Sequence, residues 1–208
     1  MNRGDKDMEF IRSSSEEEMI SVFLKTEINS ERYAVRLKRI LDDLEIDISV
    51  ISDPNIYDNK ENVIRKKVLG EYRGYDINIK LFKNFPLINR WDWVLLSKNE
   101  IEKIKYIDYS YWNELSNGTR LAKEAVKNIR KGVKVYNISN DSFIKASNEL
   151  LNGKEFPPMI ILSDLKEDFI VVLEGHLRLT AYMLEPDTIT NGLKAIVGYT
   201  SKNELKNW

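Results

Sequence analysis

The sequence lacks cysteine altogether and has a single histidine, His176, among its 208 residues. The lack of cysteine excludes disulfide bonds, thiolate metal sites and cysteine nucleophiles. One imidazole is too few for a histidine-based zinc site, so we expect no metal centre formed by the protein alone.

Long apolar runs are missing as well. No stretch approaches the roughly 18 apolar residues that a membrane span needs. The first segment, Met1–Ser15, is polar and charged and has no apolar core of signal-peptide length. We therefore expect a cytoplasmic protein without a membrane partner.

Neither sign of charge dominates, because 32 Lys and Arg residues face 33 Asp and Glu residues, for a net charge of −1. This balance excludes a protein covered in positive charge for nucleic acid, although a local basic patch remains compatible with it. The hydrophobic share of 42% and the charged share of 31% are typical of a folded globular protein. The length favours one domain with an extension.

Residues 1–85 are expected to form a helical N-terminal extension. Met1–Ser15 is predicted to be a frayed leader, and the run Ser15–Glu18 is typical of a helix N-terminus with a capping box. Apolar residues recur at helical spacing in three segments, and a fourth alternates like a half-buried strand. The helical positions are Met19, Ile20, Phe23 and Leu24, then Ala34, Leu37, Leu41 and Leu44, then Ile64, Val68 and Tyr72, and the strand positions are Ile77, Ile79 and Leu81.

Residues 86–208 are expected to form an α/β (α+β) domain, a small mixed sheet with flanking helices. Ser97–Glu100 indicates a capping box, and Gly132 and Gly153 suit the ends of two helices. Four segments have the composition of strands and alternate with the helical ones. The predicted strands are Val133–Tyr136, Met159–Leu162, Phe169–Leu173 and Ala195–Tyr199.

Two side-chain groupings admit both a structural and a functional interpretation. The aromatic-rich stretch is interpreted as core packing rather than a ligand cage, because each ring buries a large area. The basic stripe is interpreted as a solvated helix face, and its alternative is a phosphate-binding surface. The aromatic residues are Trp91, Trp93, Tyr106, Tyr109, Tyr111 and Trp112, and the stripe consists of Lys123, Lys127, Arg130 and Lys131.

The segment Glu174–Thr180 carries the clearest chemistry, because it lies where an apolar strand is followed by a helix. A helix N-terminus presents unpaired N–H groups and the positive end of the helix dipole to an anion. Gly175 permits a positive φ or a close backbone approach. Arg178 adds a bidentate donor for phosphate, His176 a further donor, and Thr180 a hydroxyl one turn later. The alternative is a strand-to-helix turn with Arg178 in a structural salt bridge.

The surrounding order of elements resembles the ParB/sulfiredoxin-like superfamily. The resemblance covers residues 133–199, and the residues that carry it include the Pro157–Pro158 pair before a strand and Ala181 after the box. Members of this superfamily carry a glycine–basic box that opens a helix. This sequence has His176-Leu177-Arg178 where the superfamily usually has an adjacent His-Arg pair.

The resemblance implies that Gly175, His176 and Arg178 bind the phosphates of a nucleotide such as ATP or CTP. One branch, the free-serine kinases, uses a glutamate base, and Glu174 stands at the matching position, where it would also reach Mg²⁺ bound with the nucleotide. N-capping of the helix is the structural alternative for Glu174. Sulfiredoxin activity is excluded, because that chemistry needs a cysteine. Centromere binding of the ParB kind is not expected, because only residues 179–208 follow the box.

A second predicted anion site is the loop from Ser116 to Arg120. It contains Gly118, its Thr119 is predicted to be the N-cap of the next helix, and Arg120 follows at once. The favoured interpretation of this loop is nevertheless a capped surface turn.

Three functions stay open at this point. The first is a nucleotide-binding protein, as a nucleotide-dependent phosphotransferase, an NTPase or a non-catalytic binder. The second is a DNA-binding or DNA-processing protein that uses the basic stripe, and the third is a non-catalytic interaction module. The sequence does not choose the nucleotide, the second substrate or the oligomeric state.

Overall fold

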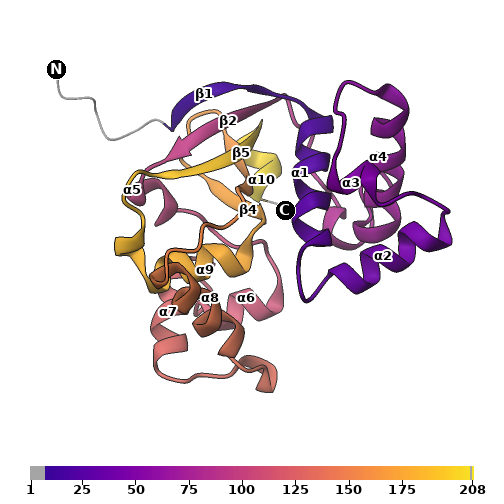
Figure 1. Ribbon diagram of the computed structural model, residues 1–208. Helices are drawn as coiled ribbons and strands as arrows, with labels where there is room; N and C mark the ends of the chain where they lie inside the picture. The colour runs from indigo at the N-terminus through magenta and orange to yellow at the C-terminus, as the bar shows by residue number, and fades with distance from the viewer. Residues whose placement is uncertain (1–7, 207) are drawn as a thin grey trace. The chain divides into compact units, whose positions relative to one another are not determined.

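The computed structural model describes residues 8–206 and 208, and it has a mixed α/β fold, as the sequence predicted (Figure 1). The chain divides into two compact units. The helical unit consists of residues 14–87, and the sheet unit consists of residues 88–208 together with the described residues before Ser14.

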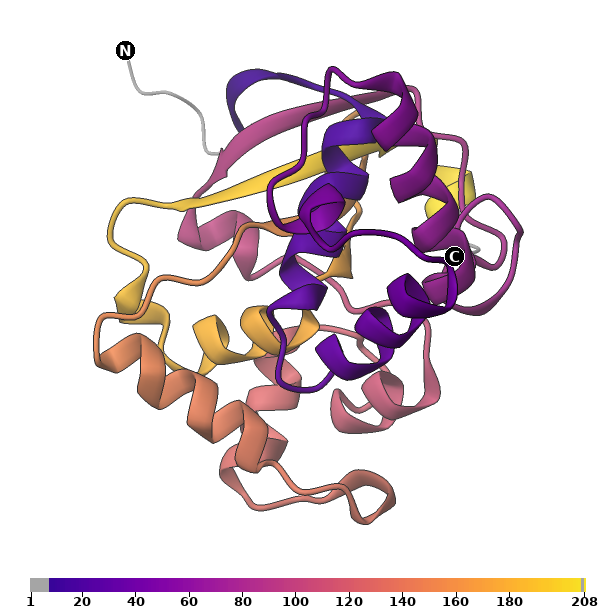
Figure 2. The same ribbon diagram turned by 45° about the vertical axis from the view of Figure 1, so that its right-hand side comes forward.

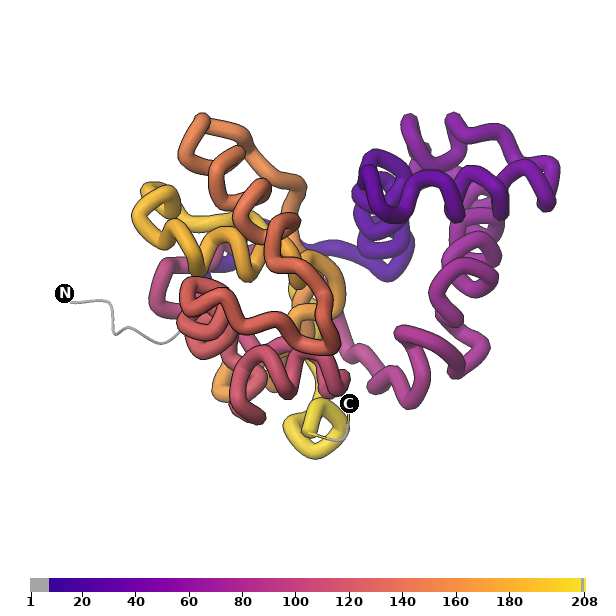
Figure 3. The backbone as a smooth tube through the Cα atoms, turned by 90° about the horizontal axis from the view of Figure 1, so that it is seen from below, coloured from indigo at the N-terminus to yellow at the C-terminus, as the bar shows by residue number. Residues whose placement is uncertain are grey.

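The helical unit contains α1 (Glu16–Ile28), α2 (Ala34–Asp43), α3 (Ser49–Ser52), α4 (Asn59–Arg73) and the 3₁₀ turn η1 (Lys80–Phe82). Figure 3 follows its backbone as a tube, in which α1 packs against α2, α3 and α4. Ser15 caps α1 as predicted, because its hydroxyl accepts a hydrogen bond from the Glu18 N–H at 3.2 Å. The Glu18 carboxylate binds the Ser14 hydroxyl, at 2.8 Å.

The prediction of a strand through Ile77, Ile79 and Leu81 is wrong. Residues 75–78 form a turn and η1 follows, with Asp76, Asn78 and Lys80 all at positive φ. Left-handed residues at every second position cannot continue an extended strand. This segment instead folds back over the end of α4, where the Lys80 ammonium donates to the carbonyl of Glu71 at 2.6 Å.

A buried arginine fastens the loop between α3 and α4 in the helical unit. Arg65 on α4 is 1% exposed and donates four hydrogen bonds through its two terminal nitrogens. Its acceptors are the carbonyls of Val50 and Asn55 and the side chains of Glu61 and Asn62. The guanidinium thus replaces water for polar groups that would otherwise be buried unsatisfied.

The sheet unit holds a five-stranded sheet in the order β1-β2-β5-β3-β4. Its strands are β1 (Glu9–Ser14), β2 (Arg90–Leu96), β3 (Met159–Asp164), β4 (Ile170–Glu174) and β5 (Leu193–Thr200). β5 pairs antiparallel with β2 and parallel with β3, and β3 pairs antiparallel with β4. The leader predicted over Met1–Ser15 is therefore wrong for residues 9–14, which form a strand next to β2, while residues 1–7 lie outside the described part.

The helices of this unit are α5 (Lys98–Ile101), α6 (Ser110–Leu115), α7 (Ala122–Arg130), α8 (Asp141–Leu151), α9 (His176–Leu184) and α10 (Lys202–Lys206), with 3₁₀ turns η2 (Val135–Asn137) and η3 (Pro186–Thr188). Side chains from one face of the sheet form a core with α6, α7, α8 and α9. In Figure 2, α7, α8 and α9 lie together beside the strands. The reciprocal capping box at Ser97 and Glu100 is confirmed at the start of α5.

The strand expected at Val133–Tyr136 is also wrong. Residues 135–137 form the turn η2, because Tyr136 and Asn137 adopt positive φ values of 50° and 58°. The predicted packing role of the aromatic stretch is confirmed for Trp91, Tyr106 and Tyr111, which are buried. It is wrong for Tyr109, which is 58% exposed.

Candidate anion site around Gly175 and Arg120

The turn between β4 and α9 requires glycine at position 175. Gly175 has a φ of 112°, a backbone conformation that side chains with a Cβ rarely adopt. A Cβ at this position would lie 2.8 Å from Cγ of Met159 and 3.0 Å from Nη2 of Arg178. The backbone conformation and the lack of space for a Cβ therefore both require glycine at position 175. No side chain caps the N-terminus of α9 at this turn.

The Arg178 guanidinium lies against Gly175 and is 6% exposed. Its Nη2 is ion-paired with the Glu174 carboxylate and donates to the carbonyl of Pro158 at 3.3 Å. Its Nε is buried and has no acceptor among the described residues. The base predicted at Glu174 and the phosphate donor predicted at Arg178 are thus each other's partner.

His176 and Thr180 contact two aromatic residues, Tyr106 and Trp112: His176 through its ring, and Thr180 through the Tyr106 hydroxyl. The His176 ring stacks on Trp112 with centroids 5.2 Å apart, and Trp112 stacks on Tyr106 at 4.3 Å. Thr180 is fully buried, donates to the His176 carbonyl at 2.8 Å and shares a 2.6 Å hydrogen bond with the Tyr106 hydroxyl. A ligand would reach the Thr180 hydroxyl only by replacing these two bonds.

The loop before α7 is held mainly by its own side chains. The Ser116 hydroxyl accepts from the Arg120 N–H at 2.8 Å, and the Thr119 hydroxyl donates to the Ser116 carbonyl at 2.8 Å. Gly118 adopts a φ of 78° and has open space around it. The N-cap predicted at Thr119 is wrong, because α7 begins at Ala122 after Leu121, and no side chain caps it. Arg120 in between is left-handed, with a φ of 62°, which delays the helix.

Tyr106 joins the two predicted sites. Its N–H donates to the Arg120 carbonyl at 2.8 Å, and its carbonyl accepts from Arg120 Nε at 2.7 Å. Its hydroxyl reaches Thr180 on α9, so one residue touches both segments that the sequence singled out. Burial raises the pKa of the Tyr106 phenol, and the bond to Thr180 opposes this shift.

Lys105, which precedes Tyr106, is a charged residue of this region that the sequence did not indicate as a site residue. Burial lowers its pKa first, and the charge of Arg120 lowers it further. Burial also lowers the pKa of Arg120, while Asp108 raises it. The backbones of residues 105–106 and 120–121 pair, so the charges of Lys105 and Arg120 are near enough to interact. The sequence signal for Tyr106 and Trp112 was their aromatic clustering, whereas nothing in the sequence distinguished Lys105 from other lysines.

The basic stripe on α7 has partners for two of its cations. The Lys127 ammonium binds the Glu124 carboxylate at 2.8 Å, and Arg130 donates to the Leu184 carbonyl at 2.6 Å. Lys123 and Lys131 are exposed. These contacts agree with the favoured interpretation of a solvated helix face.

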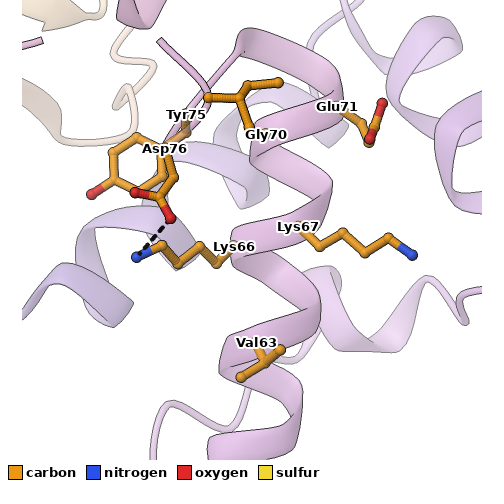
Figure 4. A pocket seen from close by; sticks show the side chains of 8 residues that line it. Val63, Lys66, Lys67, Gly70, Glu71, Tyr75 and Asp76 are labelled. Atoms are coloured by element: carbon orange, nitrogen blue, oxygen red, sulfur yellow. Dashed lines mark ion pairs between the residues drawn. The ribbon is translucent and has the colours of Figure 1, made fainter.

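A hollow of about 270 Å³ lies along α4 in the helical unit. Figure 4 shows the ion pair between Lys66 and Asp76 on one side of it, at 3.4 Å, with Lys67 directed elsewhere. Lys66 also binds Glu16 at 3.0 Å. The Lys66 charge beside this hollow is therefore compensated within the unit.

The described residues contain no group of three or more His, Cys, Asp and Glu side chains arranged for a metal ion. In the same part of the chain, no helix is both long enough and apolar enough to cross a bilayer. Comparison with family models, curated proteins and solved structures found no match to this chain.

Proposed function

We propose that the sheet unit binds the phosphate of a nucleotide at the Gly175 turn. The observation that carries this proposal is the Arg178 guanidinium, which is almost fully buried against Gly175 with its Nε lacking an acceptor. It adjoins the N-terminus of α9, where no side chain competes for the helix N–H groups. An oxyanion would satisfy both kinds of donor.

The order α8, β3, β4, Gly175, α9 and β5 supports keeping the resemblance to the ParB/sulfiredoxin-like superfamily as part of this proposal. On that basis the ligand is a nucleotide such as ATP or CTP, bound with Mg²⁺. Glu174 has two roles in this proposal. It balances the Arg178 charge in the absence of ligand, and with phosphate on Arg178 it would be available to hold Mg²⁺ or to accept a proton from a substrate hydroxyl.

The experiment uses Glu174→Gln and titrates ATP, CTP and ADP by calorimetry, each with and without Mg²⁺. Removing the carboxylate removes a competitor for the arginine, so nucleotide binding without Mg²⁺ should become several-fold tighter. The gain in affinity from Mg²⁺ should shrink. Weaker binding without Mg²⁺, or no saturable binding of any nucleotide by the unaltered protein, would contradict the proposal.

Arg178→Lys is the companion variant, because it keeps the positive charge and removes the planar donor fork. We expect roughly tenfold weaker nucleotide binding, as for a lost charge-assisted hydrogen bond. Leu177→Ala is the matched control on the exposed side of the same helical turn and should leave affinity unchanged. Circular dichroism of each variant checks that the fold is retained.

A further inference from the structure

Lys105 and Arg120 are held together by backbone pairing. Lys105 forms an antiparallel bridge with Leu121 and a parallel bridge with Val171 of β4. Its N–H donates to the Ile170 carbonyl, and its carbonyl accepts from the Val172 N–H, both at 2.8 Å. The extended segment of Lys105 is thus fixed between the Arg120 loop and the sheet, so the backbones of the two residues cannot move apart without breaking these bonds.

Arg120 is strained and incompletely bound. It is a non-glycine residue with a φ of 62°, a backbone conformation that costs free energy and persists only where surrounding contacts impose it. Its Nε is anchored to the Tyr106 carbonyl, and its Nη2 is buried without an acceptor. One hydrogen bond therefore orients the guanidinium, and its Nη2 remains a donor without an acceptor.

Neither cation forms an ion pair with a carboxylate among the described residues. The Lys105 ammonium lies over the Phe169 ring, 4.7 Å from its centroid. Asp108 influences Arg120 only at longer range, and its carboxylate accepts a 2.7 Å hydrogen bond from Asn113. Single surface cations are common, but two neighbouring cations that both lack an ion-pair partner create a positive potential that favours an anion.

We propose that Lys105 and Arg120 form a binding site for the phosphate group of a small ligand. A phosphate dianion matches the two positive charges, and its oxygens suit both an ammonium and a planar guanidinium. A carboxylate would balance only one of the charges. The site lies outside the Gly175 turn, and its existence does not depend on nucleotide binding at that turn.

The test titrates inorganic phosphate, pyrophosphate and ATP into the full chain by calorimetry and compares Lys105→Gln with the unaltered protein. We expect saturable binding of pyrophosphate, weakened roughly tenfold or more by the substitution, because a charge-assisted hydrogen bond is lost. Lys103→Gln is the matched control, since it removes the same charge from an exposed lysine two residues away and should leave affinity unchanged. Equal weakening by both substitutions would overturn the proposal, because it would indicate general charge attraction.

Arg120→Lys is the second variant, and it keeps the charge while removing the donor fork. It should also weaken pyrophosphate binding, with the fold checked by circular dichroism. Binding that Lys105→Gln and Arg120→Lys both leave intact would overturn the proposal, and so would the absence of binding to any of the three probes. Binding of an oligonucleotide without binding of pyrophosphate would overturn the assignment to a small ligand.

The same titrations distinguish this site from the Gly175 turn. Loss of ATP binding in Arg178→Lys, together with pyrophosphate binding that Lys105→Gln leaves unaffected, would support the turn and overturn the site proposed here. Loss of ATP binding in Lys105→Gln, with ATP binding unchanged in Arg178→Lys and Glu174→Gln, would support this site and contradict the proposed function.

Discussion

The buried or half-buried arginines of the helical unit and of the sheet unit differ in their hydrogen-bond acceptors and in their charge partners. Arg65 of the helical unit has four acceptors on four residues, one of them the Glu61 carboxylate. Arg120 of the sheet unit has one acceptor for its side chain among the described residues, the Tyr106 carbonyl, and its charged neighbours are Lys105 and Asp108, neither of which forms an ion pair with it. Arg178 lies between these extremes, with one carboxylate and one carbonyl.

The difference teaches that a single unsatisfied donor does not define a site. Arg65 also has a buried Nε without an acceptor, yet its charge is balanced and it holds a loop in place. Arg120 combines the unsatisfied donor with a cationic neighbour, the lack of an ion-pair partner among the described residues, and a strained backbone. Charge balance therefore separates Arg65 from Arg120. Arg178 is charge-balanced as well, and what distinguishes it from Arg65 is its place beside the uncapped N-terminus of α9.

The largest expected effect is in the helical unit. Arg65→Ala should lower the free energy of unfolding by about 3 to 5 kcal/mol, because it leaves the partners of a buried charge without a donor. Urea denaturation followed by circular dichroism measures the change. Lys67→Ala, at an exposed lysine of the same helix, should change stability by less than about 0.5 kcal/mol. Similar losses in the two variants would show that Arg65 is not a structural anchor.

The next effect concerns glycine in the sheet unit. Gly175→Ala should cost more than about 2 kcal/mol, because strain at positive φ adds to the clash with Met159 and Arg178. Gly118→Ala has the same backbone penalty but open space around it, so it should cost only about 1 kcal/mol. Thermal and urea unfolding of both variants measure this. Equal costs would remove the packing argument for Gly175.

Alkaline pH should destabilise both units through buried tyrosines. Burial raises the pKa of Tyr72, with Glu27 adding to the shift, and burial likewise raises that of Tyr106. The stabilisation is complete below the unfolded pKa near 10 and is lost as pH rises above it, because only the unfolded chain ionises there. The loss is about 1.4 kcal/mol per pH unit for each such tyrosine.

Urea unfolding at several pH values between 8 and 11 measures this slope. Tyr72→Phe should reduce the slope for the helical unit and leave that of the sheet unit unchanged. An unchanged slope in this variant would mean that Tyr72 ionises alike in the folded and unfolded chain.

The smallest expected change in the free energy of unfolding is opposite in sign to that of Arg65→Ala. Lys105→Gln should leave stability unchanged or raise it, by less than about 0.5 kcal/mol, because it removes the screened repulsion between a half-buried lysine and Arg120. Urea unfolding at low and high salt measures it, and any gain should fade as salt screens the pair. Clear destabilisation would indicate that Lys105 has a structural role instead.

Local signals predicted much of the fold correctly. Ser15 caps α1, Ser97 and Glu100 form their box, and Gly153 follows α8 at positive φ, since each depends on neighbours within one helical turn. Two of the errors lie where apolar alternation suggested strands. Ile77 and Ile79 alternate with residues that the fold holds in left-handed conformations, and Val133–Tyr136 shares this feature at Tyr136.

The candidate site was predictable only in part. Gly175 and Arg178 stand out because a glycine and an arginine follow a buried strand. The pairing of Arg178 with Glu174 follows from their spacing of four residues, although the sequence left open whether phosphate or carboxylate would be the partner. Lys105 gave no local signal, because its importance depends on the position of Arg120.

The sequence by itself determined most of the longer helices, the apolar strands β3, β4 and β5 and where glycine is needed, since these depend on local geometry and on burial of apolar surface. Only the tertiary structure decided which polar groups meet. The hydrogen bond between Tyr106 and Thr180 joins residues 74 positions apart. The proximity of Lys105 and Arg120 arises from strand pairing. Contacts of this kind are fixed by the packing of whole elements, and spacing along the chain does not encode them.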